Sequence, residues 1–130
     1  MLPHTADLRA RVFGVSLEDL FQNALAGFAH IIGAGISRGE PIQHKFALES
    51  GSATNLLIDF LNEALYCSNV EKAIFDQVTF SELSESKLVG ILRGHRVDRF
   101  AEDVKAVTYH GAEIRQDTAG KFAVELVFDV

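Results

Sequence analysis

The chain has 130 residues, of which 48% are hydrophobic and 23% charged, and a formal net charge of −6 at pH 7. A single globular domain of this size can bury a core without disulfides or a structural zinc, and the acidic balance argues against a dedicated nucleic-acid binder. Cys67 is the one cysteine, which excludes an internal disulfide and a CxxC site. Since no apolar run approaches about 18 residues and no signal peptide is recognised, we expect a cytoplasmic, non-membrane protein.

Hydrophobic periodicity predicts both helices and strands along the chain. Ser16 begins a capping-box-like segment, after which apolar residues recur at three- and four-residue intervals until Gly33. A second apolar stripe with the same period follows Ser52 or Thr54, either of which is a suitable helix cap. The other segments alternate with the period of strands. In chain order the predicted elements are strand 6–13, helix 16–32, strand 41–49, helix 52–70, and strands 73–83, 88–93, 104–115 and 122–128.

This order of elements predicts an α+β fold for a single domain spanning residues 1–130. The last four strands read as two consecutive hairpins, because polar turns separate 73–83 from 88–93 and 104–115 from 122–128. Hairpins favour a largely antiparallel sheet. We therefore expect two layers, with the sheet in one and both helices packed on one of its faces.

The two ends of the chain suggest a cation site. Asp129 and Val130 are neighbours, so a side-chain carboxylate is tethered close to the main-chain carboxylate, and Asp7 would add a third anionic oxygen ligand. Hard oxygen ligands suit Ca²⁺ or Mg²⁺ better than a soft metal. The alternative is that Asp7 caps a turn and the last two residues form a solvated tail.

Other candidate residues are less informative. The five histidines show no HxH, HxxxH or Cys/His spacing, and no P-loop, HExxH or Gly-x-Ser-x-Gly motif is present. Asp59 and Glu63 stand one helical turn apart, which indicates a carboxylate pair or simply the polar face of the second helix. Lys105 lies in an otherwise apolar strand, where it would either neutralise carboxylates at the strand ends or protect a sheet edge from pairing.

Five segments, in order and over essentially the whole chain, resemble the archease family. They are His4-Thr5-Ala6-Asp7, Gly14–Ala24, Asn55–Tyr66, Val104–His110 and the terminal Phe128-Asp129-Val130. The resemblance implies a small α+β protein that assists the RtcB-type RNA ligase, which joins RNA 2′,3′-cyclic phosphate or 3′-phosphate ends to 5′-hydroxyl ends. Such a protein is not itself an enzyme. It promotes guanylylation and multiple turnover of the ligase in tRNA splicing or RNA repair.

The resemblance also implies the identity of the site. Asp7, Asp129 and Val130 correspond to the family's metal ligands, with Ca²⁺ as the expected ion and Mg²⁺ or another divalent ion as the alternative. His4, Lys105 and His110 lie in the matched motifs and are candidates for supporting the site. The expected partner is the ligase itself.

Two other functions stay open. One is a metal-dependent phosphate-ester hydrolase, with Asp7 and Asp129 as ligands and His110 as the acid or base. The other is a chaperone for RNA-modifying enzymes, a role that has also been attached to the archease family. Turnover of phosphate esters without any ligase would indicate the hydrolase, and suppression of aggregation for unrelated clients would indicate a general chaperone.

Overall fold

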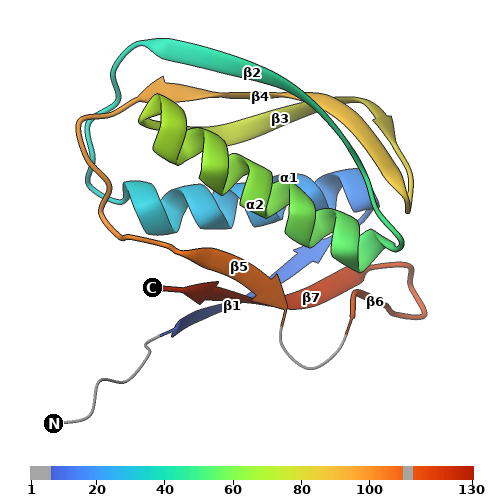
Figure 1. Cartoon of the computed structure of the whole chain (residues 1–130). Coiled ribbons are helices and arrows are strands. Elements are labelled where there is room, and N and C mark those ends of the chain that lie inside the picture. The colour runs from blue at the N-terminus through green and yellow to red at the C-terminus, as the bar shows by residue number, and fades with distance from the viewer. Residues whose placement is uncertain (1–6, 110–112) are drawn as a thin grey trace, which may run out of the picture.

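The computed structural model describes residues 7–109 and 113–130 (Figure 1). Both helices begin and end close to the residues that the sequence predicts. The elements are β1 (Asp7–Gly14), α1 (Leu17–Gly33), β2 (Pro41–Glu49), α2 (Ala53–Glu71), β3 (Ala73–Leu83), β4 (Lys87–Arg96), β5 (Ala106–Tyr109), β6 (Arg115–Gln116) and β7 (Phe122–Asp129).

Side-chain caps explain where the helices start. The hydroxyl of Ser16 accepts a hydrogen bond from the Asp19 N–H (3.1 Å), and the Asp19 carboxylate accepts one from the Val15 N–H (2.9 Å). The hydroxyl of Ser52 accepts from the Asn55 N–H in the same way (3.1 Å). These bonds satisfy backbone donors that have no partner within the first helical turn. Ser52, rather than Thr54, is therefore the cap of α2.

The α+β class and the antiparallel pairing are confirmed, but the layers differ from the prediction. The strands form two antiparallel sheets, one ordered β1-β7-β5 with β6 also paired to β7, and the other ordered β2-β4-β3. Both helices lie between these sheets, so each helix is covered on two sides (Figure 1). Periodicity marks which residues of a strand face inward, but it does not specify which distant strand becomes the partner. The sequence pattern therefore did not show that the strands divide into two sheets.

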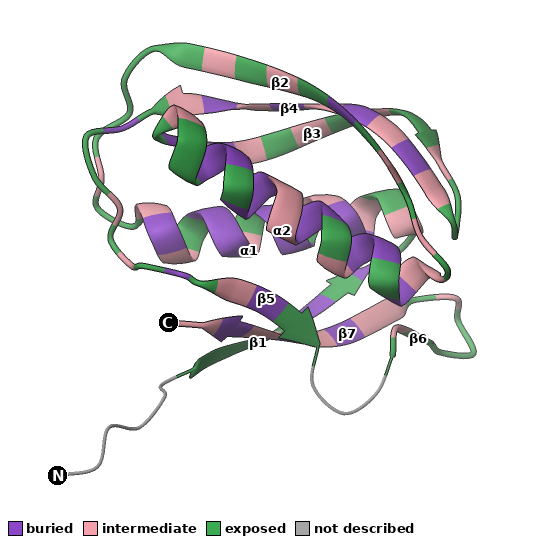
Figure 2. Ribbon diagram, in the orientation of Figure 1, coloured by how far each residue is buried: buried purple, intermediate pink, exposed green. Residues whose placement is uncertain are grey.

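Aromatic side chains fill the space between the two sheets. Phe60 of α2 is fully buried, and its ring centroid lies 5.6 Å from that of Phe21 and 5.5 Å from that of Phe46. Phe28 of α1 stacks on Phe128 of β7 with centroids 6.1 Å apart. The buried residues accordingly line the helices and the inner faces of both sheets (Figure 2). As predicted, alternate residues of β7 point to the core.

The strand predicted over 104–115 is shorter in the structure. β5 covers only Ala106–Tyr109, and β6 covers only Arg115–Gln116, although both pair with β7 as the predicted hairpin requires. Residues 110–112, which include His110, lie outside the described part of the chain.

An amide side chain from each helix is bonded to a strand backbone. The side-chain amide of Asn62 in α2 donates to the Val107 carbonyl (2.9 Å), and its oxygen accepts from the Val107 N–H (3.0 Å). Gln22 in α1 makes the equivalent pair of bonds to Asp76 and Val78 of β3 (3.0 and 2.9 Å). β5 and β3 are edge strands of their sheets. The amides therefore bond to backbone groups that an edge strand would otherwise leave unpaired.

We expect Asn62→Ala to lower the free energy of unfolding by roughly 1–3 kcal/mol, because it leaves backbone groups of Val107 without a partner. Asn69→Ala, an exposed substitution on the same helix, should change it by less than about 0.5 kcal/mol. Denaturant titration of both variants measures the difference. Equal unfolding midpoints for the two variants would show that the amide does not tether β5.

Candidate metal centre

The strand register brings two of the predicted ligands together. β1 pairs antiparallel with β7 from Gly14 opposite Phe122 to Asp7 opposite Asp129. Residues directly opposite in such a ladder have Cα atoms about 4.5–5.5 Å apart and side chains on the same face. Asp7 and Asp129 therefore form a cross-strand pair of carboxylates at one end of the sheet, although they are 122 positions apart in the sequence.

The last residue is held by the fold rather than solvated. Val130 is half-buried and its side chain packs against the hydrophobic core. The chain end lies beside the start of β1 (Figure 1). Asp7 belongs to a strand and Val130 is packed, so neither half of the turn-cap and solvated-tail alternative describes the structure.

Arginine side chains of β1 lie next to this pair. Arg9 approaches Asp7 with an Nε–Oδ1 distance of 3.7 Å and lies 3.9 Å from Glu125, which is also 3.7 Å from Arg11. Like charges directly opposite each other destabilise a sheet. A bound cation would remove that repulsion, and anionic oxygen donors from two strands and a chain terminus fit a hard divalent ion.

Lys105 contributes its backbone to this end of the sheet. Its N–H donates a 2.6 Å hydrogen bond to the Asp129 carbonyl, and the next residue, Ala106, is paired with Asp129. Its ammonium group lies 3.3 Å from the Asp103 carboxylate, and both side chains are largely exposed. Lys105 thus precedes β5 and forms an ion pair with Asp103. His4 and His110, the other candidates for site support, lie outside the described residues.

A second group of metal-ligating side chains was not predicted. His44 of β2, Glu63 and Cys67 of α2 place one ligand atom each within 4.8 Å of one another. Burial in the core raises the pKa of the Cys67 thiol to about 12, and the neighbouring Glu63 charge and hydrogen bond add to the rise. The thiol is therefore protonated and unreactive in the metal-free protein, as expected for a buried cysteine. The four-residue spacing of Glu63 and Cys67 was the one local signal, because His44 joins them only through packing.

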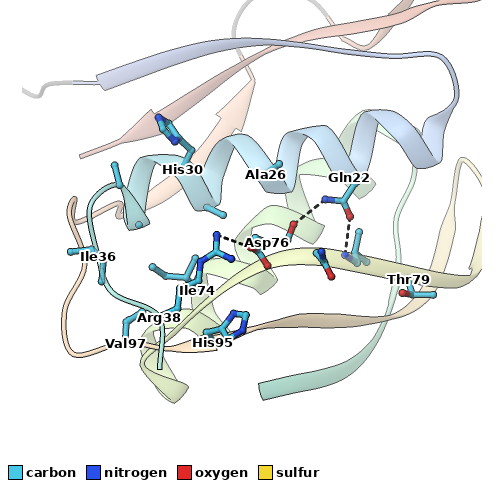
Figure 3. Close-up of a pocket in the computed structure, with 15 residues that line it drawn as sticks. Gln22, Ala26, His30, Ile36, Arg38, Ile74, Asp76, Thr79, His95 and Val97 are labelled. Carbon is cyan, nitrogen blue, oxygen red and sulfur yellow. Dashed lines mark hydrogen bonds and ion pairs between the residues drawn. The ribbon is translucent and has the colours of Figure 1, made fainter. Parts of the chain in front are cut away.

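A cleft with a volume of about 550 Å³ lies between α1 and β3 (Figure 3). Several of its polar side chains already have partners within the protein. Arg38 lies 3.3 Å from Asp76 across the cleft, and Gln22 bonds to the β3 backbone. None of the three predicted ligands lines it. The cleft is therefore a weaker candidate for a functional site than the end of the β1–β7 pair.

Comparisons with known proteins agree over the whole chain. The model of the Archease protein family (MTH1598/TM1083) matches residues 1–130. The protein archease of Methanosarcina mazei is 31% identical over 138 residues, covering 99% of this chain and 93% of that protein. The protein archease of Pyrococcus abyssi is also 31% identical, covering 98% of this chain and 94% of its own length.

Two solved structures are similar to this fold. The solution structure of Methanobacterium thermoautotrophicum protein 1598 matches with a TM-score of 0.68 and 25% identity, covering 99% of this chain and 96% of that one. A Thermotoga maritima crystal structure, described as an archease and possible chaperone, matches with a TM-score of 0.72 and 19% identity, covering 100% and 95%. Within the described residues, no helix is long and apolar enough to cross a membrane.

Proposed function

This chain belongs to the archease family, and from that premise we propose that it is a non-enzymatic activator of an RtcB-type RNA ligase. The activator promotes guanylylation and multiple turnover of the ligase in tRNA splicing or RNA repair. It acts through a divalent cation, calcium in the first instance, held by Asp7, Asp129 and the Val130 carboxylate. The observation that supports this most directly is the cross-strand pairing of Asp7 with Asp129.

The position of these residues suggests how a cation would serve the partner. The three groups lie at the beginning of β1 and the end of β7, which are paired in one sheet. A cation bound there would hold these two chain segments to each other. Transfer of a nucleotidyl group, like phosphoryl transfer, depends largely on positioning and electrostatic stabilisation. A partner protein that orders a charged surface beside the ligase can therefore raise its rate without performing chemistry of its own.

We expect the ligase to complete more turnovers when this protein is present than when it acts alone. Guanylylation of the ligase and RNA joining should be followed in parallel under substrate excess. The activator should be stripped of metal with a chelator, freed of the chelator and then reloaded, so that the ligase's own metals are untouched. Calcium reloading should restore the stimulation. A ligase whose turnover is the same with and without the protein would contradict the proposal.

The hydrolase alternative is tested in the same preparations. The protein alone, loaded with calcium or magnesium, should leave generic phosphate monoesters and diesters intact, since an activator contributes no catalytic step. Turnover of such esters that disappears in Asp129→Ala would instead indicate a metal-dependent hydrolase, and the ligase proposal would then lose its basis.

A chaperone role has one supporting observation, the description of the Thermotoga maritima relative as a possible chaperone. The exposed large apolar side chains in residues 7–109 and 113–130 are spread over β1, the turn after it, α2 and β5. Single exposed apolar residues are normal for a monomer, whereas binding of unfolded clients uses contiguous apolar surface. We therefore rank a general chaperone below the ligase activator, and aggregation assays with unrelated clients distinguish the two.

A further inference from the structure

We propose that His44, Glu63 and Cys67 form a second cation site, separate from Asp7 and Asp129, that binds Zn²⁺ or a similar borderline transition-metal ion. The three residues come from β2 and α2, which contact each other, whereas Asp7 and Asp129 lie on the other sheet (Figure 1). The inference is independent of the ligase proposal, because it rests on a different set of side chains.

Two of the three distances between ligand atoms match those of a tetrahedral zinc site. His44 Nε2 lies 3.5 Å from Glu63 Oε2, and Cys67 Sγ lies 3.5 Å from the same carboxylate oxygen. With zinc bonds of about 2.0–2.3 Å, two ligands in a tetrahedron are separated by roughly 3.3–3.6 Å. The third pair, His44 to Cys67, is within 4.8 Å and needs only a small side-chain adjustment. One ion can therefore contact all three atoms.

The ligands are carried by two regular elements. Glu63 and Cys67 are four residues apart, which places them on the same face of α2. His44 sits in the middle of β2, paired with Leu92 of β4, and its neighbours on the same face of the strand include the buried Phe46. Ligands on a helix and a strand are held more accurately than ligands on loops. The backbone positions of all three ligands are therefore set by the fold, and only a side-chain adjustment is needed for an ion to bind.

The burial of the three residues indicates an open coordination position. Cys67 is 3% exposed, whereas the side chains of His44 and Glu63 are 38% and 29% exposed. An ion would thus be held from the core side by sulfur and reached by water from the surface. Three protein ligands and a solvent molecule are the usual complement of an open zinc site.

The donor set separates this site from the one at the chain ends. A thiolate and an imidazole favour zinc, cobalt or copper, whereas carboxylate oxygens alone favour calcium or magnesium. Binding requires the Cys67 thiol to lose its proton to solvent, because the thiolate is the ligand. The hydrogen bond from Cys67 to Glu63 is then replaced by two bonds to the same ion. Neither oxidation nor reduction is involved.

Cobalt(II) titration of the full chain tests the proposal, since a thiolate ligand gives a sulfur-to-cobalt charge-transfer absorption that oxygen ligands do not. We expect one equivalent of cobalt to produce this band and one equivalent of zinc to abolish it. Excess calcium should leave it unchanged. If the band is absent when the protein is in excess over cobalt, the proposal is wrong.

Two variants and one control complete the experiment. Cys67→Ser should lose the charge-transfer band. His44→Gln changes a partly exposed side chain without opening the core. It should weaken cobalt binding at least about 10–100-fold, because a loss of that size is typical even for residues that only hydrogen-bond to a metal ligand. Asn69→Ala, an exposed substitution on the same helix as Cys67, is the control and should keep both the band and the affinity for cobalt. Unchanged affinity in a folded His44→Gln variant would rule out the three-residue site.

Discussion

Asp129→Ala should abolish the stimulation of ligase guanylylation while leaving the protein folded. The substitution removes one of two carboxylates that face each other across the β1–β7 pair, so the proposed cation loses an anionic ligand. Asp129 is only partly buried, and the hydrogen bond that its backbone carbonyl accepts from Lys105 does not depend on its side chain. Such substitutions usually change stability by less than about 0.5 kcal/mol. Asp7→Ala should behave in the same way.

A second measurement separates loss of the cation from loss of the ligase surface. An ion that binds the folded state alone stabilises it, by about 2.7 kcal/mol at a concentration 100 times its Kd. Calcium should therefore raise the thermal unfolding midpoint of the parent protein but not that of Asp129→Ala. Circular dichroism on the same preparations gives both the fold and the midpoint.

The chain offers two matched controls. Asp103→Ala removes a carboxylate from the same region, but that side chain is 82% exposed and pairs only with Lys105 among the described residues. Cys67→Ala removes a thiol that the ligase proposal does not use. Both should stimulate the ligase normally. If Asp7→Ala and Asp129→Ala also stimulated it normally, the cation-dependent mechanism would be wrong.

The local structure was predictable because its causes are local. Ser16 and the apolar stripe behind it define α1, and the alternation from Pro41 to Glu49 defines a strand that the structure reproduces with the same bounds. The structure extends β4 to Arg96, beyond the predicted end, because pairing with β2 and β3 continues there. Strand ends depend on partners, and partners are not visible in a window of sequence.

The arrangement in space needed information that no short segment carries. β7 pairs with β1 from the other end of the chain, and this pairing divides the expected single sheet into two. Because of this long-range pairing, no short segment of the sequence could show that Asp7 and Asp129 lie next to each other. His44, Glu63 and Cys67 were missed for a similar reason, because β2 and α2 come together through tertiary packing that no local pattern specifies.

Adding a single glycine after Val130 should remove stimulation of the ligase and calcium-dependent stabilisation together. The addition converts the Val130 carboxylate into a neutral amide carbonyl and moves the terminal charge about 3.8 Å along the chain. Calcium affinity depends strongly on the number of charged ligands, so we expect it to fall at least about tenfold. The fold should persist, because β7 already ends at Asp129 and no strand pairing is changed.

Two companion variants identify which property of the terminus matters. Val130→Ala keeps the main-chain carboxylate but shortens a side chain that packs against the core, so it should cost some stability and retain calcium binding. Amidation of Val130 removes the charge without adding a residue, and it should reproduce the defect of the glycine extension. If the amidated and extended proteins stimulate the ligase as well as the parent, the terminal carboxylate is not a ligand. A site built from Asp7 and Asp129 would then have to draw its remaining oxygen ligands from water or from the ligase.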